Sequence, residues 1–393
     1  MAKTNSSDSF LKKPVASFYM LVISSLALSV LGLIMVFSAS SIYSLGSKGT
    51  TVAVVLRQLI FLVLAIPLAV YVSRLPIHVW KIISRLGLIL SIVLLLALRI
   101  PGLGKTVNGN TNWISLKFVD VQPSELAKLF IILWASYMLA RKENGGNARF
   151  NVILQIAPGF IIVMVLVLWG KDLGTVSVIA AILGGMLFIS GIRMKVLGSI
   201  VAAGSLVFAF LIATANYRLE RFLVVLNPFA EGDYKNAGWQ PAHSLLGLAS
   251  GGIFGVGIGG SRQKWGNLAE AHTDFIFSVI GEELGLIGAL FTLSLLAILI
   301  ICVFRISLRA KDPLSRYACA GIGCWLTVQT LLNIGSATSL LPVVGVTLPL
   351  VSYGGSALIS TFLALGYVMG VSLRDPQVRD ELKKRFHKAR LNS

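Results

Sequence analysis

Acidic side chains gather in one short stretch of this chain, residues 267–285, which reads NLAEAHTDFIFSVIGEELG. Only 16 of the 393 residues are acidic, so such a cluster is unexpected. Its titratable side chains are Glu270, His272, Asp274, Glu282 and Glu283. A carboxylate at the border of an apolar run has a raised pKa, which suits it to accept a proton near neutral pH. These acids are candidates for a general base; the alternatives are helix capping for Asp274 and solvent exposure for Glu282 and Glu283.

A second polar group stands in QPSELAKL, residues 122–129, where Pro123 opens an apolar segment. On a helix, Ser124 and Lys128 share a face, and Glu125 reaches Lys128 at the i+3 spacing. Facing a cavity, Lys128 would attract an anion such as pyrophosphate. The alternative is that its side chain extends outward to water.

Two further motifs place polar groups at helix starts. Asp172 precedes a helix in KDLGT, and PLVSYGGS offers Ser352, Tyr353 and free backbone N–H groups before the last apolar run. The positive end of a helix dipole favours an anion at such places. By contrast, the glycines of GVGIGG match a dinucleotide fingerprint without the βαβ unit that it requires. Gly255, Gly257 and Gly260 therefore indicate a tight or re-entrant loop.

The elements that carry these residues are apolar helices. Hydrophobic residues make up 56% of the chain, and several runs approach the length of about 20 residues that crosses a bilayer as a helix. The sequence predicts an all-α polytopic membrane protein. Ten spans are expected near residues 17–38, 52–73, 83–99, 124–140, 150–169, 173–192, 196–215, 282–304, 317–338 and 350–372. No strong breaker stands between Asp274 and Phe304, and a helix of that length would measure about 46 Å, against about 30 Å of hydrocarbon. Roughly two turns should therefore protrude, tilt or bend at the outer boundary.

The net charge of +18 follows the positive-inside pattern, with Lys and Arg concentrated in alternate connectors and in the last twenty residues. This distribution argues against nucleic acid as a partner and places both termini in the cytoplasm. The expected organisation is a cytoplasmic tail (1–15), a ten-span domain (16–373) with outer loops at about 100–123 and 216–281, and a basic cytoplasmic tail (374–393). The large second loop joins spans seven and eight. The basic tail is expected to contact anionic lipid or a cytoplasmic partner, with simple topological anchoring as the alternative.

Taken together, the motifs resemble the SEDS family (shape, elongation, division and sporulation). The matching stretches are NWI (112–114), QPSELAKL (122–129), DLGT (172–175), NPF (227–229), EAHTDFIFSVIGEELG (270–285) and LPLVSYGGS (348–356). They occur in the family's order across residues 15–373, and the GEELG ending is more similar to the division members than to the elongation members.

The resemblance implies a peptidoglycan glycosyltransferase of the bacterial cytoplasmic membrane, at the division septum. Such an enzyme polymerises lipid II into β-1,4-linked glycan strands on the outer face, with inversion and release of undecaprenyl pyrophosphate. Implied partners are a class B penicillin-binding protein, other division proteins and membrane lipid. No tightly bound cofactor is implied, and a divalent cation (Mg²⁺ or Mn²⁺) stays open because no metal ligands can be named.

By the same resemblance, the essential carboxylate of the family corresponds to Asp274 and its functional lysine to Lys128. The expected substrate-binding residues are Lys128, Glu125, Ser124, His272, Thr273, Asp172, Ser352 and Tyr353. The chain departs from the family at Asn112, where a basic residue is common, and Lys105, Lys117 or Lys171 are candidates for supplying that charge. Two other functions stay open: a lipid II flippase, and a non-catalytic scaffold of the division machinery.

Overall fold

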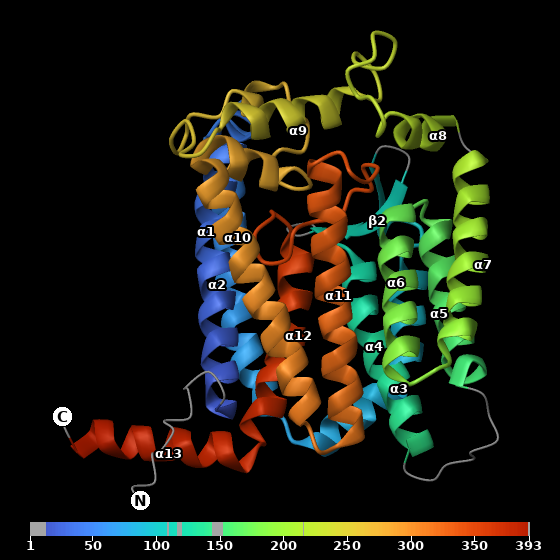
Figure 1. The fold of residues 1–393 in the computed structure, drawn as a ribbon, viewed down its shortest axis with the longest axis vertical. Coiled ribbons are helices and arrows are strands. Elements are labelled where there is room, and N and C mark those ends of the chain that lie inside the picture. The colour runs from blue at the N-terminus through green and yellow to red at the C-terminus, as the bar shows by residue number, and fades with distance from the viewer. Residues whose placement is uncertain (1–12, 108–109, 116–119, 144–151, 215, 392–393) are drawn as a thin grey trace, which may run out of the picture.

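The structure is a computed structural model that describes residues 13–107, 110–115, 120–143, 152–214 and 216–391 (Figure 1). Within these ranges ten long helices run roughly parallel to one another, and three shorter helices lie at the ends of the bundle. The long helices are α1 (Pro14–Lys48), α2 (Ala53–Ser73), α3 (Ile77–Ala97), α4 (Pro123–Glu143), α5 (Val152–Trp169), α6 (Leu173–Ile189), α7 (Met194–Ala213), α10 (Ile276–Arg309), α11 (Pro313–Ala337) and α12 (Gly355–Leu373). The shorter ones are α8 (Asn216–Leu223), α9 (Trp239–Ser250) and α13 (Pro376–Leu391).

The ten long helices correspond in order to the ten predicted spans, which confirms an all-α polytopic fold. Eight of them, in the part of the chain described, are long and apolar enough to cross a bilayer by themselves. Of the other two, α6 is somewhat short and α4 carries the charged residues of QPSELAKL and of its last turn. The chain is a multi-pass membrane protein.

The start of α1, the end of α12 and helix α13 lie at one pole of the bundle, and α8 and α9 lie at the other (Figure 1). The polar motifs of the sequence lie toward the α8–α9 pole, because they stand at the starts of α4, α6, α10 and α12. We call this pole the outer end. At the opposite pole, α13 extends sideways from the bundle, roughly perpendicular to the spans.

Packing distinguishes a central group of helices from a peripheral one. In α12, 72% of the most apolar window is buried inside the protein, whereas in α7 none of it is. The helices α4, α11 and α12 contact one another and form the centre of the bundle, and α7 stands at its edge (Figure 1). Polar side chains that project from the central helices are therefore removed from lipid.

Three features differ from the predicted spans. Helix α1 continues to Lys48 instead of ending near residue 38, because its first strong terminator is Gly49, at φ 71°. Helix α12 begins at Gly355 rather than near 350, since Leu350 has a left-handed backbone (φ 65°) and belongs to the preceding loop. The loop before α4 contains a small antiparallel sheet of β1 (Gly104–Val107), β2 (Asn110–Ser115) and β3 (Asp120–Val121).

The helix expected to run from Asp274 to Phe304 is also interrupted. Gly285 has φ 68° and ψ −166°, and it divides α10 into an outer segment, Ile276–Leu284, and the span below it. The expectation that no strong breaker stands between Asp274 and Phe304 is therefore wrong, and of the three arrangements expected for the first turns the structure shows the bend. We call Ile276–Leu284 the outer segment of α10 from here on.

Candidate active site

Asp274 lies directly before the outer segment of α10, at the outer end of the bundle. Phe275, not Asp274, is the N-cap residue, and no side chain caps this helix start. The capping alternative for Asp274 is therefore wrong. Its backbone carbonyl accepts a hydrogen bond from Asn333 Nδ2 at 2.8 Å, and the same amide group donates to the carbonyl of Val346 at 2.7 Å. Asn333 thus fixes the backbone of Asp274 against α11 and the loop that follows it.

The Asp274 carboxylate is poised to exchange a proton near neutral pH. Burial raises its pKa to about 7, and the carboxylates of Glu270 and Asp172 act in the same direction, whereas the Arg221 guanidinium lowers it. Within the described ranges no hydrogen bond or ion pair engages this carboxylate, and its side chain is only partly buried. An unpaired carboxylate with such a pKa has the properties of a general base.

The two residues before Asp274 are held by the loop that precedes α12. Tyr353 N donates to the carbonyl of His272 at 2.9 Å, and Ser352 Oγ donates to the carbonyl of Thr273 at 2.5 Å. Ser352 Oγ also accepts from Leu348 N at 2.8 Å. The prediction that this turn offers free donors to an anion is wrong for Ser352 Oγ and for Tyr353 N, because both bind the Asp274 segment instead.

His272 forms an aromatic stack beside Asp274. Its ring centroid lies 5.1 Å from that of Tyr43 and 5.6 Å from that of Tyr353. Burial lowers the pKa of His272, so the imidazole is neutral near pH 7. Thr273 Oγ1 donates to Glu270 Oε2 at 2.7 Å. This bond orients the Glu270 carboxylate, whose charge raises the pKa of Asp274.

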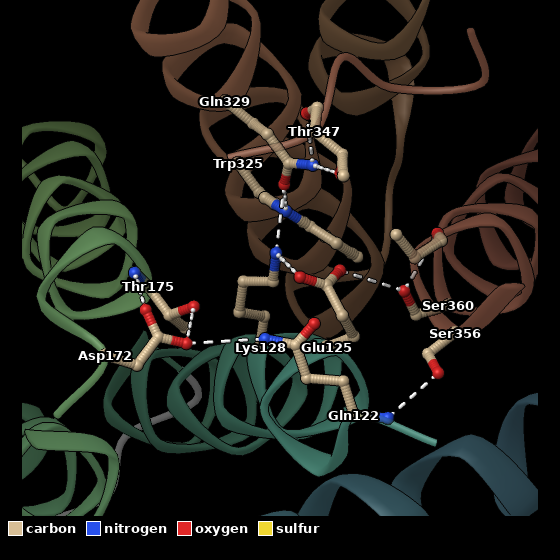
Figure 2. Close-up of polar contacts among 11 residues, drawn as sticks. Gln122, Glu125, Lys128, Asp172, Thr175, Trp325, Gln329, Thr347, Ser356 and Ser360 are labelled. Atoms are coloured by element: carbon tan, nitrogen blue, oxygen red, sulfur yellow. Dashed lines mark hydrogen bonds and ion pairs between the residues drawn. The ribbon is translucent and has the colours of Figure 1, made fainter. Parts of the chain in front are cut away.

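Lys128 is buried at the centre of a polar cluster between α4 and α11 (Figure 2). Its Nζ lies 2.7 Å from Glu125 Oε1 and 3.0 Å from Gln329 Oε1, and 5.0 Å from the centre of the Trp325 ring. Gln329 Nε2 in turn donates to the carbonyl of Thr347 at 2.9 Å. Lys128 is 1% exposed, so the alternative that it extends outward to water is wrong. Its charge is compensated inside the bundle.

The starts of α4, α6 and α12 meet beside this cluster. Asp172 caps α6 by accepting hydrogen bonds from Thr175 N at 2.8 Å and Thr175 Oγ1 at 2.7 Å, and Gln122 Nε2 lies 3.3 Å from its Oδ2 (Figure 2). Gln122 N donates to Ser356 Oγ at 2.9 Å. Ser124 is buried in a small cavity lined also by Asn112, Gly170 and Asp172, and its Oγ finds no partner among the described residues. The expected helix-start position of Asp172 is confirmed, and its carboxylate is engaged in the cap.

Glu282 and Glu283 lie inside the protein rather than in solvent, each with 1% exposure. Their partners come from the chain between α9 and α10 and from α1. The alternative that the two glutamates are exposed to solvent at the membrane border is therefore wrong. The prediction of a tight glycine loop is confirmed, because Gly255 and Gly257 have φ values of 81° and 94° and the loop packs against the break in α10.

Several residues of the site escaped sequence reasoning. Asn333 and Gln329 stand inside an apolar helix, and polar side chains at such depth are a signal for function or for packing of a site. Tyr43 gave no signal, because the first span was expected to end before it. Two cations also lie near the site: Arg57 contacts the Tyr353 hydroxyl, and the charge of Arg221 lowers the pKa of Asp274.

The three lysines considered as replacements for a basic residue at Asn112 differ in position. Lys105 is paired with Asp120 at 2.7 Å on the small sheet, and the pair is half-exposed. Lys171 is exposed with φ 64°. Lys117 lies outside the described residues. Within the described ranges no group of three or more His, Cys, Asp or Glu side chains is arranged so that it could hold a metal ion.

Comparison with known proteins gives one family over almost the whole chain. Residues 18–376 match the family model FTSW_RODA_SPOVE, described as cell cycle protein. A protein of Coxiella burnetii named "Probable peptidoglycan glycosyltransferase FtsW" is 38% identical over 90% of this chain and 95% of its own length. A protein of the same name from Geobacter metallireducens is 36% identical over 90% of this chain and 94% of its own length.

Solved structures agree with this assignment. A chain of a peptidoglycan synthase complex, from work on the coordination of polymerization and crosslinking, superposes with a TM-score of 0.72 at 29% identity, covering 90% of this chain and 97% of the other. The rod shape determining protein RodA of Thermus thermophilus superposes with a TM-score of 0.66 at 27% identity, covering 90% and 95%. The chain described here belongs to the FtsW/RodA/SpoVE family of cell cycle proteins.

Proposed function

We propose that this chain is a peptidoglycan glycosyltransferase that polymerises lipid II at the outer membrane face, with Asp274 as its general base. One observation carries the proposal: a partly buried, unpaired carboxylate with a pKa of about 7 stands at the outer end of the bundle, where a lipid-linked sugar would present its headgroup. The relatives whose names state this activity match the chain along nearly their full length.

The proposed step is one displacement at an anomeric carbon. Asp274 takes the proton from the 4-hydroxyl of the acceptor sugar as that oxygen bonds to the anomeric carbon of the donor. The bond from the anomeric carbon to the pyrophosphate oxygen breaks, and undecaprenyl pyrophosphate leaves with the electron pair. Attack opposite to the leaving group inverts the configuration and gives a β-1,4 link. General-base assistance of this kind contributes about 10²- to 10⁴-fold to a rate.

The leaving pyrophosphate needs positive charge nearby, and the basic residues near the site differ in their ability to supply it. Lys128 is neutralised by Glu125 at 2.7 Å, so in this conformation we assign it to the organisation of α4 and α11. Arg57 and Arg221 are exposed cations that act on Tyr353 and Asp274, and we assign the pyrophosphate contact to them. A divalent cation would depend on one or two carboxylates together with phosphate oxygens. Glu270 and Asp274 are the pair that fits this description, and no step above depends on it.

The wider setting is proposed from the family. The partners would be a class B penicillin-binding protein, which crosslinks the nascent strands, and other division proteins at the septum. Both termini would be cytoplasmic, in keeping with the start of α1 and helix α13 at the pole opposite to α8 and α9 (Figure 1). The basic helix α13, at that same pole, would face the anionic inner leaflet.

Purified protein in detergent with labelled lipid II tests this function. Glycan ladders that disappear on digestion with a muramidase are the expected product. If no ladder forms with or without the crosslinking partner, while the protein moves labelled lipid II across the bilayer of a vesicle, the protein is a flippase. If neither activity occurs, a scaffold role replaces both.

A further inference from the structure

The outer segment of α10 is separated from the span below it by a break in the helix. At Gly285 the helical backbone is interrupted, and a Cβ at this position would overlap Gly255 N and Ile253 O. The groups freed by the break are taken up by the glycine loop: the carbonyl of Glu282 accepts from Val256 N at 3.0 Å, and Leu286 N donates to Gly252 O at 2.9 Å. The direction of the segment therefore depends on its lateral contacts, and Asp274 stands at its far end.

The strongest lateral contact is a buried ion pair. Lys264 Nζ lies 3.2 Å from Glu283 Oε1, and Ser38 Oγ donates to the same carboxylate oxygen at 2.6 Å. Lys264 Nζ also lies 3.1 Å from Ser38 Oγ. All three side chains are buried. The triangle joins α1, the turn Gln263–Trp265 and the outer segment of α10.

Glu282 adds a second set of contacts on the same turn of the helix. Its carboxylate accepts hydrogen bonds from Ser261 Oγ at 2.5 Å and from Arg262 N at 2.8 Å. Both adjacent glutamates thus hold the chain between α9 and α10 against the base of the outer segment.

We propose that Lys264, Glu283 and Ser38 form a positioning cluster that sets the direction in which the outer segment holds Asp274. The inference rests on the proposed function, because it assigns a role in the reaction to residues that do not touch the substrate. The other end of the segment is held by Asn333 on the carbonyl of Asp274 and by Ser278, whose Oγ donates to the carbonyl of Ser244 at 2.7 Å. The cluster supplies the fixed point nearest to the break.

A small rotation of the outer segment at Gly285 would displace Asp274 by a large distance. At a helical rise of about 1.5 Å per residue, the eleven steps from Gly285 to Asp274 span at most about 16 Å. A rotation of about 5° at the break would therefore move Asp274 by about 1.4 Å, and a misplacement of about 1 Å can cost about 100-fold in rate.

A stabilising role alone does not account well for the cluster. Two charges taken out of water cost free energy, and replacing such a pair by apolar groups of similar size is often neutral or stabilising. A buried pair that spans three elements is suited instead to fixing one arrangement of them. The cluster should therefore affect the reaction more than it affects folding.

The test compares the double variant Lys264→Met/Glu283→Gln with wild type, each as full-length protein with its partner. Removing both charges avoids an unpaired buried ion, so the protein should fold. We expect kcat for polymerisation, per folded molecule, to fall at least about 10-fold while KM for lipid II changes by less than about twofold. We also expect the midpoint of the pH–rate profile to move below that of wild type. A displaced Asp274 would be less buried, and burial is the largest of the effects that raise its pKa.

The control is the double variant Glu143→Gln/Arg316→Gln, which removes another ion pair, at the pole opposite to Asp274. It should polymerise at the wild-type rate. Wild-type kcat and pH midpoint in the Lys264/Glu283 double variant would overturn the positioning role, as would a loss of activity that only follows a loss of folded protein. Should that variant not fold, Ser38→Ala decides, since it keeps the ion pair and removes one contact: an unchanged kcat and pH midpoint rejects the inference. If wild type itself makes no glycan, it is the proposed function that fails.

Discussion

Replacing Lys128 by Met distinguishes a structural role for the lysine from binding of the pyrophosphate, and the structure predicts the structural role. The substitution leaves Glu125 buried without its partner at 2.7 Å and removes the contact to Gln329 at 3.0 Å. Removing one member of a buried ion pair costs about 3–5 kcal/mol, because the remaining charge is uncompensated. We therefore expect Lys128→Met to unfold at a clearly lower temperature than wild type. Lipid II polymerisation should fall in step with the loss of folded protein.

The paired variant makes the argument quantitative. In Glu125→Gln/Lys128→Met no charge is left unpaired, so most of the lost stability should return, with a coupling free energy of about 3 kcal/mol between the two sites. Lys128→Arg should keep part of both stability and activity. The measurements are thermal unfolding in detergent and the rate of glycan synthesis per folded molecule. Wild-type stability in Lys128→Met together with a raised KM for lipid II would refute this reasoning and make Lys128 a ligand of the pyrophosphate.

Three further predictions follow from single positions. Gly285→Ala should destabilise the protein, because φ at this position is 68° and a Cβ has no room; the backbone strain alone costs about 1–3 kcal/mol. Gly184→Ala, where a Cβ meets open space, should not destabilise it, and thermal unfolding of both variants checks this. Polymerisation should increase as pH rises through about 7, because the base must be deprotonated, and a flat profile from pH 6 to 8 would contradict the assignment. Cysteine at Gly232, where a side chain has open space, should react with an impermeant reagent on intact cells, and cysteine at Lys384 should react only after permeabilisation.

The fold was predictable because apolar runs and the distribution of basic residues report directly on the membrane. The number and order of the ten long helices follow from length and hydropathy. The details at helix ends depend on single backbone conformations. The extension of α1 to Lys48 and the break at Gly285 both required knowledge of where the chain accommodates a left-handed residue.

The sequence indicated several motifs that come together, but indicated neither their contacts nor the neighbouring residues Asn333, Gln329 and Tyr43. The motifs that carry Asp274, His272 and Tyr353 do meet at the outer end, as their places at helix starts indicate. What no local pattern revealed was that Glu283 has its partner on α1, 245 residues away in sequence at Ser38. For the same reason the Ser352 hydroxyl looked free in the sequence, although it donates to the carbonyl of Thr273. Pairing over such distances is a property of the packed bundle.

The central claim is that Asp274 accepts the proton of the attacking hydroxyl. Asn at this position preserves the size of the side chain but cannot act as a base near neutral pH, so the rate should fall by about 10²- to 10⁴-fold. The protein should fold normally, because the Asp274 carboxylate has no partner among the described residues and the Asn333 contact is to its backbone. Glu231→Gln serves as the control, since it removes an exposed acid from the same outer loop.

The decisive measurement is therefore the rate of glycan polymerisation from lipid II by purified Asp274→Asn, normalised to folded protein and compared with wild type and Glu231→Gln. The account predicts a folded Asp274→Asn protein that forms no glycan ladder, beside a Glu231→Gln protein with wild-type ladders. Polymerisation by Asp274→Asn within about tenfold of the wild-type rate would contradict it, because general-base assistance accounts for at least about 100-fold.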